Sequence, residues 1–217
     1  MARPATNHES RKVAIVEAAL DCFATHGYDG TTNKIIAEAA GMKSPGIIYH
    51  YFGSKEDLFQ ACLERVSVFD TMRDLMIANQ DEPPEVFLRQ AAHTYLRLMR
   101  DDERLVKLAM IGFSSFQSHP EVPPLALRRV VPSLLLPLAA YFQRQAEAGV
   151  LRPLSPLSAV MQFFSPLVFR AITNRLAPGV WPIPVESDDA YVDGLVQTFL
   201  EGARRHDTLP PAGSHSH

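Results

Sequence analysis

Three lysines in the first quarter of the chain lie close to expected helix starts: Lys34, Lys43 and Lys55. The unpaired backbone N–H groups of a helix N-terminus create positive potential, so a nearby lysine strengthens a site for an anion such as phosphate. Without an anion the same place is electrostatically unfavourable for a lysine, although Lys55 could also be an ordinary surface residue. The placement of these lysines therefore favours phosphate binding.

Sequence patterns that support catalysis are absent. The chain contains neither G-x-S-x-G nor a Walker A pattern, and it lacks G-x-G-x-x-G, H-E-x-x-H and the Glu-x-x-His pairs of helical di-iron proteins. Its eight histidines have no metal-ligand spacing, and Cys22 and Cys62 are expected to be buried free thiols rather than a disulfide. We therefore expect no enzyme, no metal and no cofactor, with a helical-bundle enzyme as the least favoured alternative.

Short helices separated by sharp turns are expected to position the lysines. Ser, Thr and Ser-Pro are typical helix starts, and glycine is typical of the residue just beyond a helix end. In chain order, the predicted starts and stops are Ser10, Gly27, Thr32, Gly41, and Ser44 followed by Pro45. The third of these helices is predicted to run from residue 45 to about residue 52.

A long fourth helix is predicted to begin at Ser54. The run from Ser54 to Asp57 has the pattern of a capping box, in which the serine side chain and an acidic side chain satisfy each other's backbone N–H groups. An apolar helical pattern then continues from Leu58 to Met76. The result would be a helix of roughly 25 residues, long enough to connect two domains and to act as a lever between them.

The remainder of the chain also has helical periodicity. Patterns run at about 85–100, 103–117, 125–148, 156–176 and 188–205, and none alternates with a period of two for long. Only two of the 17 prolines precede residue 61, and Pro132, Pro137 and Pro166 are expected to bend or interrupt helices. The helical periodicity predicts an all-α protein. No window is apolar enough to span a membrane, so a cytoplasmic protein is expected.

Three short helices followed by a longer one, with Gly41 in the turn before the third, predict a helix-turn-helix. The segment GYDGTTNKIIAEAAGMKSPGIIYHYFGSKEDLF, residues 27–59, closely resembles the DNA-binding domain of the TetR family of transcriptional regulators. The resemblance covers about residues 10–60. Between Gly41 and Tyr49 this chain has one residue more than the commonest family pattern, which leaves the register of base-reading positions around residues 43–46 open by one residue.

The resemblance implies which residues contact DNA. The first turn of the third helix would read base edges, while residues at its end and at neighbouring helix N-termini would bind phosphates. The implied set is Thr32, Lys34, Lys43, Ser44, Pro45, Gly46, Ile47, Tyr49, His50 and Lys55. Each residue has a structural alternative: the hydroxyl residues cap helices whatever the function, His50 could simply be solvated, and Tyr49 could be a core aromatic, as Phe52 is expected to be.

The resemblance also implies a ligand-binding and dimerising C-terminal domain. Aromatic, Met and polar residues of this region are candidate ligand contacts, although they could equally form an ordinary core: His93, Tyr95, Met110, Phe113, Phe116, Phe163 and Phe164. Two broad apolar helix faces near the end of the chain would pair with a second copy, or alternatively pack within one chain. The interface candidates are Val160, Phe164, Leu167, Leu195 and Phe199.

The predicted organisation is a flexible arm at 1–9, a helix-turn-helix domain at 10–57, a helical ligand-binding and dimerisation domain at 58–207 and a disordered tail at 208–217. Bulk charge gives no support to DNA binding, because residues 1–60 hold six Lys and Arg against seven Asp and Glu. The expected function is nevertheless that of a dimeric repressor, released from a palindromic double-stranded operator by a small, largely apolar effector. A regulator of the same fold that is controlled by a partner protein, or that is constitutive, remains the alternative.

Overall fold

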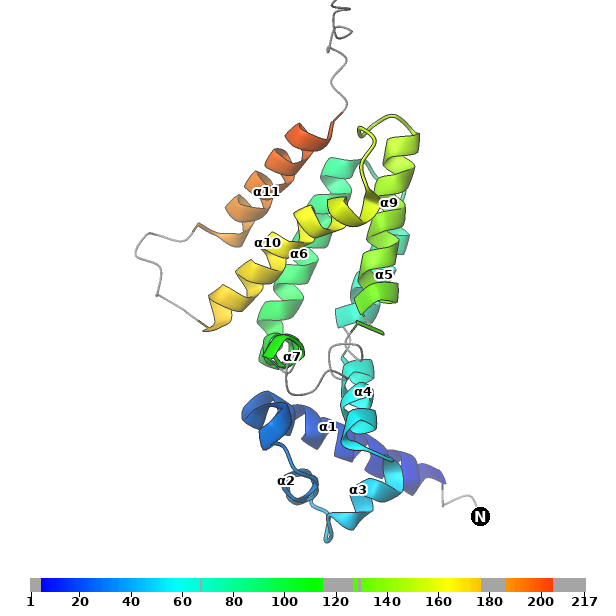
Figure 1. Ribbon diagram of the computed structural model, residues 1–217, viewed down its shortest axis with the longest axis vertical. Helices are drawn as coiled ribbons and strands as arrows, with labels where there is room; N and C mark the ends of the chain where they lie inside the picture. The colour runs from blue at the N-terminus through cyan, green and yellow to red at the C-terminus, as the bar shows by residue number, and fades with distance from the viewer. Residues whose placement is uncertain (1–4, 67, 115–126, 129, 177–185, 205–217) are drawn as a thin grey trace, which may run out of the picture. The chain divides into compact units, whose positions relative to one another are not determined.

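The computed structural model describes residues 5–66, 68–114, 127–128, 130–176 and 186–204, and these are helical apart from connecting segments and one isolated bridge between Leu151 and Arg204 (Figure 1). The all-α prediction is confirmed. The elements are α1 (Ala5–Gly30), α2 (Asn33–Ala39), α3 (Gly46–Tyr51), α4 (Lys55–Arg65), α5 (Val68–Ala78), α6 (Pro84–Asp101), α7 (Glu103–Ser114), the π-helical turn η1 (Val131–Leu135), α9 (Leu136–Glu147), α10 (Pro156–Leu176) and α11 (Asp188–Ala203).

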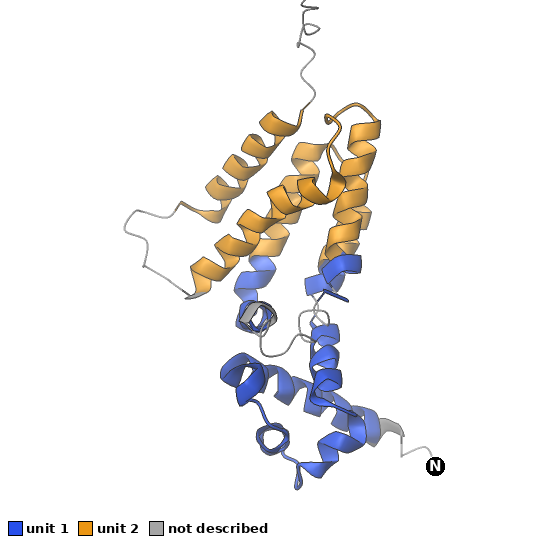
Figure 2. Cartoon of the chain, viewed as in Figure 1, with its two compact units in different colours: residues 1–71, 97–133 blue, residues 72–96, 134–217 orange. Residues whose placement is uncertain are grey.

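The chain forms two compact units, coloured separately in Figure 2. Unit 1 comprises residues 1–71 and 97–133, and unit 2 comprises residues 72–96 and 134–217. The predicted boundary at residue 57 is therefore not where the chain divides, because α4 and α7 both pack into unit 1. No helix of the described residues is long and apolar enough to cross a membrane. The predicted tail at 208–217 lies outside the described residues.

Helix α1 differs from its prediction at both ends. It begins at Ala5, so Ser10 lies inside the helix rather than at its cap, and residues 5–9 are helical rather than a flexible arm. Its regular backbone is interrupted at Gly27, which has a φ of 71° and a ψ of −179°. A positive φ is readily adopted only by glycine, so the stop predicted at this residue is a real break in the helix.

The turn between α2 and α3 forms as its residues predict. The Thr32 hydroxyl oxygen accepts a hydrogen bond from the Ile35 amide at 3.3 Å, which caps α2. Gly41 has a φ of 66° and allows the chain to turn sharply after α2. At the start of α4, the Ser54 hydroxyl accepts from the Asp57 amide at 3.0 Å, as one half of the predicted capping box requires.

The long fourth helix is not formed as predicted. Helix α4 ends at Arg65, Val66 has an extended backbone with a ψ of 114°, and α5 begins at Val68. Val66 and Val68 are both buried, and β-branched residues have a low intrinsic preference for helix, so packing of these valines prevails over a continuous helical pattern. The prediction of one continuous helix from Ser54 to Met76 that acts as a lever between two domains is therefore wrong.

Unit 2 is built on the packing of α9 against α10 and of α10 against α11. Its core includes the fully buried rings of Phe87, Tyr141 and Phe142, with Phe87 and Tyr141 stacked 3.7 Å apart between ring centroids. The predicted proline interruptions take two forms: Pro132 and Pro137 lie in the π-helical turn and the first turn of α9, whereas Pro166 lies inside α10.

Candidate nucleic-acid interface

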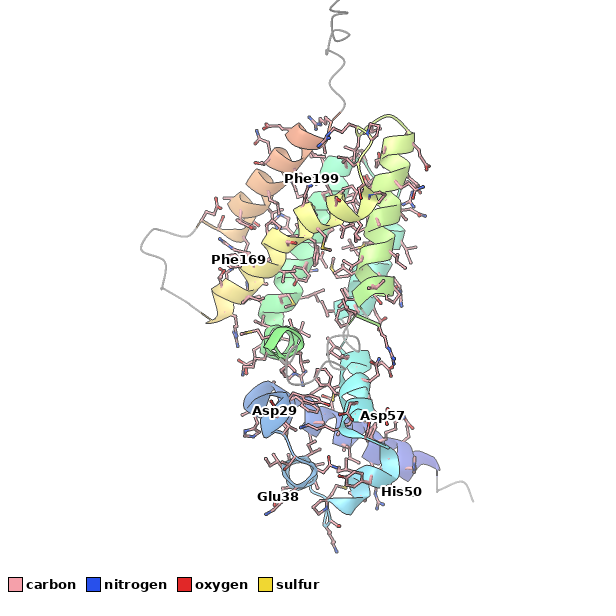
Figure 3. All side chains as sticks on the ribbon, viewed as in Figure 1. Asp29, Glu38, His50, Asp57, Phe169 and Phe199 are labelled. Carbon is pink, nitrogen blue, oxygen red and sulfur yellow. The ribbon has the colours of Figure 1, made fainter. Side chains whose placement is uncertain are left out.

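Helix α3 has one buried and one exposed face. Ile48 and Phe52 are 1 % and 6 % exposed and anchor the helix in unit 1. Tyr49 is 65 % exposed, and His50, labelled in Figure 3, is also exposed. Tyr49 is thus not a core aromatic, whereas Phe52 is one, as expected. The exposed face leaves a phenol hydroxyl and an imidazole available for contacts with a partner.

The segment before α3 is open to solvent. Lys43, Ser44, Pro45 and Gly46 are exposed, and Ile47 is half-buried. The Ser44 hydroxyl accepts a hydrogen bond from the Gly46 amide at 3.3 Å, which holds the first turn in place. A Cβ built on Gly46 would make only an ordinary contact, 3.5 Å from the Ser44 hydroxyl oxygen. Neither the backbone nor internal packing therefore requires glycine at this position.

Thr32 and Lys34 are exposed at the start of α2. The cap hydrogen bond uses an acceptor site of the Thr32 hydroxyl, so its proton is still available to a partner. Lys34 is one of the first residues of α2, where free backbone N–H groups add to its charge. Both residues are therefore accessible for contact with DNA.

Lys55 is more enclosed than the sequence suggested. Its ammonium nitrogen lies 4.5 Å from the centroid of the Tyr28 ring, and the Tyr28 hydroxyl donates to the Glu56 carboxylate at 3.0 Å. Burial is the largest effect on Lys55 and lowers its pKa, opposed by the nearby carboxylates of Asp29 and Glu56. The cation–π contact gives Lys55 a structural role in addition to the phosphate contact predicted for it.

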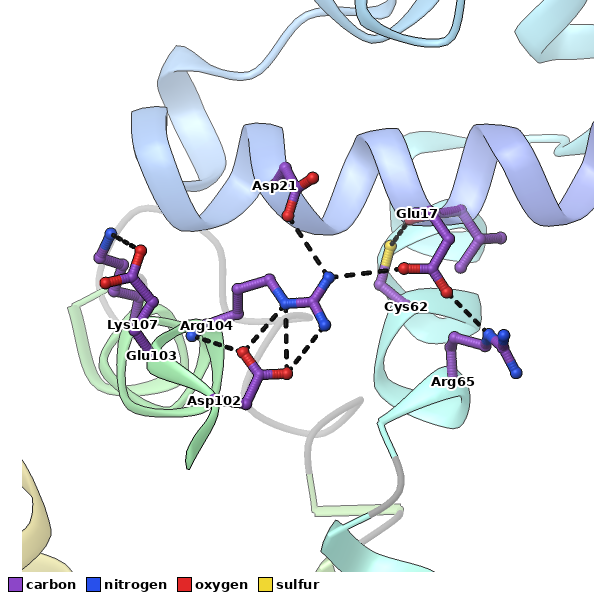
Figure 4. A network of polar contacts seen from close by, with 9 residues as sticks. Glu17, Asp21, Cys62, Arg65, Asp102, Glu103, Arg104 and Lys107 are labelled. Atoms are coloured by element: carbon purple, nitrogen blue, oxygen red, sulfur yellow. Dashed lines mark hydrogen bonds and ion pairs between the residues drawn. The ribbon is translucent and has the colours of Figure 1, made fainter. Parts of the chain in front are cut away.

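Unit 1 also contains a charged network that joins α7 to α1 (Figure 4). The Arg104 guanidinium is 2.8 Å from the Asp102 carboxylate and 3.4 Å from the carboxylates of Glu17 and Asp21. Glu17 pairs in turn with Arg65 on α4 at 2.9 Å. The hydrogen bond from Arg104 is the largest effect on the Asp102 pKa and lowers it. This network fixes α1, which supports the α2–α3 pair, against α4 and α7.

The candidate ligand residues are not brought together as one set. Tyr95, Phe163 and Phe164 are buried in unit 2, where the rings of Tyr95 and Phe164 lie 4.6 Å apart. His93 is also in unit 2, 3.5 Å from the Asp189 carboxylate. Met110 belongs to unit 1 and is 36 % exposed. The side chain of Phe113 and the whole of Phe116 lie outside the described residues.

Tyr95 differs from three other tyrosines that are buried or half-buried. The hydroxyls of Tyr28, Tyr141 and Tyr191 donate to Glu56, to the Glu82 carbonyl and to the Pro166 carbonyl. Tyr95 is 7 % exposed, and no acceptor for its hydroxyl exists among the residues that the structure describes. Burial raises its pKa, so the group stays a neutral donor. The hydroxyl oxygen is not among the fully buried atoms without a partner, so it remains able to donate to a bound molecule.

The residues of α10 predicted for the dimer interface are buried within one protomer. Val160, Phe164 and Leu167 are 0 %, 6 % and 0 % exposed and face the core of their own protomer. On α11, Leu195 and Phe199 are half-buried, and the Phe199 ring packs on Phe142 and Phe163 at 5.3 and 5.4 Å. Sequence periodicity identified an apolar helix but not which side of it faces inward.

A different side of α10 is apolar and exposed. Leu157, Met161 and Phe169 are 58 %, 41 % and 60 % exposed. Their spacing of four and eight residues places them along one stripe of the helix. Phe169 is labelled in Figure 3. This stripe, which we call the α10 stripe, was not singled out by the sequence, because its members are fewer and more widely spaced than the buried ones.

The arrangement defines a class of protein: an all-helical chain with an N-terminal helix-turn-helix and a helical C-terminal unit. Residues 15–62 match the family model for bacterial regulatory proteins of the TetR family, and residues 87–202 match the model for the C-terminal domain of AefR-like transcriptional repressors. The chain therefore belongs to the TetR family of transcriptional regulators. Family membership confirms the prediction of a DNA-binding regulator rather than an enzyme.

Individual relatives agree with this family. The chain is 55 % identical over 47 residues, 22 % of its length and 24 % of the relative's, to the transcriptional repressor AcnR of Corynebacterium glutamicum. It is 29 % identical over 148 residues, 64 % of its length and 65 % of the relative's, to the dual regulator CecR of Shigella flexneri. The chain thus spans about a quarter of AcnR and about two thirds of CecR.

Solved structures share the fold over nearly the whole chain. A protein from Mesorhizobium loti assigned to the TetR family superposes with a TM-score of 0.73 at 24 % identity, over 91 % of this chain and 98 % of that one. The regulator FadR of Bacillus subtilis, solved in complex with stearoyl-CoA, gives a TM-score of 0.70 at 19 % identity, over 88 % and 98 %.

Proposed function

We propose that this protein is a dimeric repressor that binds a palindromic operator through α3 and is released by a small, largely apolar effector. The observation that carries the DNA-binding part is the exposed face of α3 and the turn before it. Tyr49 and His50 are exposed polar side chains of this helix, and its opposite face is buried in the core. Because the target would be chromosomal DNA, the proposal includes a cytoplasmic location.

The exposed residues divide into two roles. Lys43, Ser44 and Lys34 would contact base edges, and Gly46 would let the backbone approach the groove, since nothing inside the protein requires a glycine there. Ile47 could touch a thymine methyl, and Pro45 sets the first turn. Tyr49, His50, Thr32 and Lys55 would bind phosphates, which position the protein without reading sequence.

The α10 stripe supports the dimer. Three large apolar side chains exposed along one helix are costly in water and suit a symmetric contact with a second copy. On α11, a Cβ at Gly194 or Gly202 would meet nothing within 4 Å, so this helix also presents a smooth surface for close approach. A dimer would space two α3 helices for successive major grooves, about 34–36 Å apart.

The sensing part is supported by Tyr95. The Tyr95 hydroxyl lacks an acceptor among the described residues and lies on a side chain that packs against the Phe164 ring, which suits a ligand that is mainly apolar and carries one hydrogen-bond acceptor. The FadR structure was solved in complex with stearoyl-CoA, whose acyl chain is long and apolar, and this supports an effector with a large apolar part. A regulator controlled by a partner protein would have the same α3 but no use for this hydroxyl.

Selection from a randomised duplex library tests the DNA-binding proposal. The wild-type protein is expected to enrich one palindrome. Tyr49→Phe should weaken binding to all duplexes alike, whereas Ser44→Ala or Lys43→Ala should change which sequences are enriched, because only base contacts specify. Enrichment of no duplex would contradict the proposal. An unchanged preference in both the Ser44 and Lys43 variants would contradict the assignment of base contacts.

A further inference from the structure

The first turns of α1 lie beside α3. The His8 ring is 4.6 Å from the Tyr51 ring and 6.2 Å from the His50 ring, between centroids. One turn further along, the Lys12 ammonium lies 6.0 Å from the centroid of the Phe52 ring. Figure 1 shows the start of α1 close to α3. The sequence assigned residues 1–9 to a flexible arm and residues 10–14 to the first helix of the helix-turn-helix domain, but it named no DNA contact among them, and the family model begins only at residue 15.

This part of α1 is exposed and basic. All residues from 8 to 14 are exposed, and Glu9 is the one acidic residue among them. His8, Arg11 and Lys12 are spaced by three and four residues, so they share one helix face. Residues 8–14 therefore lie on the surface of unit 1, and the buried part of α1 begins at Ile15.

Arg11 and Lys12 have no carboxylate partner among the described residues, in contrast to three other basic residues of unit 1. Arg65 and Arg104 pair with Glu17, and Lys107 pairs with Glu103. Two cations at adjacent positions repel each other. A polyanionic partner bound to this exposed face would offset that repulsion.

We propose that His8, Arg11 and Lys12 form a second DNA-binding surface on α1 that holds the phosphate backbone beside the groove occupied by α3. This inference rests on the proposed function, because it requires α3 to lie in a major groove. A major groove about 12 Å wide admits one helix. A second helix held against the end of α3 must therefore lie at the rim of the groove, where phosphates are the available groups and no base is read.

The double variant Arg11→Gln/Lys12→Gln tests this surface. Glutamine keeps a high helix preference, so α1 should stay helical, as circular dichroism can check. Binding is measured by fluorescence anisotropy on a mixed-sequence duplex and on the selected operator over a series of salt concentrations. Loss of two phosphate contacts should make the slope of log K against log salt shallower by about 1.8, which corresponds to a loss of up to about 60-fold at 0.1 M salt.

Two further variants separate this effect from net charge. Arg97→Gln/Arg144→Gln changes the net charge equally at exposed positions on α6 and α9, outside the helix-turn-helix, and should keep the wild-type slope. Arg11→Lys/Lys12→Arg keeps both charges in α1 and should restore binding to both duplexes.

The outcomes distinguish this surface from the proposed function. A wild-type slope in the Arg11→Gln/Lys12→Gln variant would overturn the α1 surface and leave the role of α3 intact. So would a loss confined to the operator, because phosphate contacts act on every sequence. A wild-type protein that binds neither duplex would overturn the proposed function, and the α1 surface with it.

Discussion

Replacing Phe169 by glutamate should separate the proposed dimer into monomers. Phe169 is the most exposed large apolar side chain of the α10 stripe, at 60 %, so its substitution should disturb the protomer little. Glutamate is also compatible with helix, which limits local unfolding. In a symmetric dimer the change acts twice, once on each protomer.

The size of the effect follows from the exposed area. A phenylalanine side chain buries roughly 200 Å², so 60 % exposure leaves about 120 Å² for a partner to cover. At about 25 cal/mol per Å², this area is worth about 3 kcal/mol for each protomer and about 6 kcal/mol for the dimer. The figure is an upper limit, since binding also orders side chains, and it corresponds to about four orders of magnitude in the dissociation constant.

Sedimentation equilibrium over a range of protein concentrations measures this constant directly. The wild-type protein should sediment at twice the mass of one chain at micromolar concentration, and Phe169→Glu at the mass of one chain. Leu136→Glu is the matched control, because Leu136 is 59 % exposed but lies on α9. The reasoning fails if Phe169→Glu remains dimeric at the wild-type dissociation constant, or if Leu136→Glu disrupts the dimer as strongly.

Two further predictions concern stability. Tyr95→Phe should leave the free energy of unfolding in urea unchanged or slightly higher, because the hydroxyl has no acceptor among the residues that the structure describes. Tyr141→Phe should instead lower the free energy of unfolding by about 1 kcal/mol, because it removes the hydrogen bond to the Glu82 carbonyl. Equal losses in the two variants would refute the assignment. Arg104→Gln should lower the melting temperature near neutral pH. The lowered pKa of Asp102 means that its stabilisation is present above about pH 4 and is lost as pH falls through the native pKa. Melting curves of the two proteins should therefore converge in acid, and a constant difference across the pH series would contradict this account.

Local signals in the sequence determined most of the helix-turn-helix. Thr32 and Ser54 cap their helices, and Gly27 and Gly41 take positive φ values, because capping and backbone freedom depend on residues only a few positions apart. The same locality allowed the family to be identified from residues 27–59. The two cysteines are buried and free, as their apolar neighbours indicated.

Tertiary packing decided what local patterns could not. The apolar run from Leu58 to Met76 fits one helix, but burial of Val66 and Val68 divides it. Likewise, an apolar helix such as α10 can turn any of its sides inward, and its register is set by every neighbour at once. Val160 is therefore buried in the protomer while Phe169 is exposed, because periodicity reports how apolar a face is and only the packed structure reports what covers it.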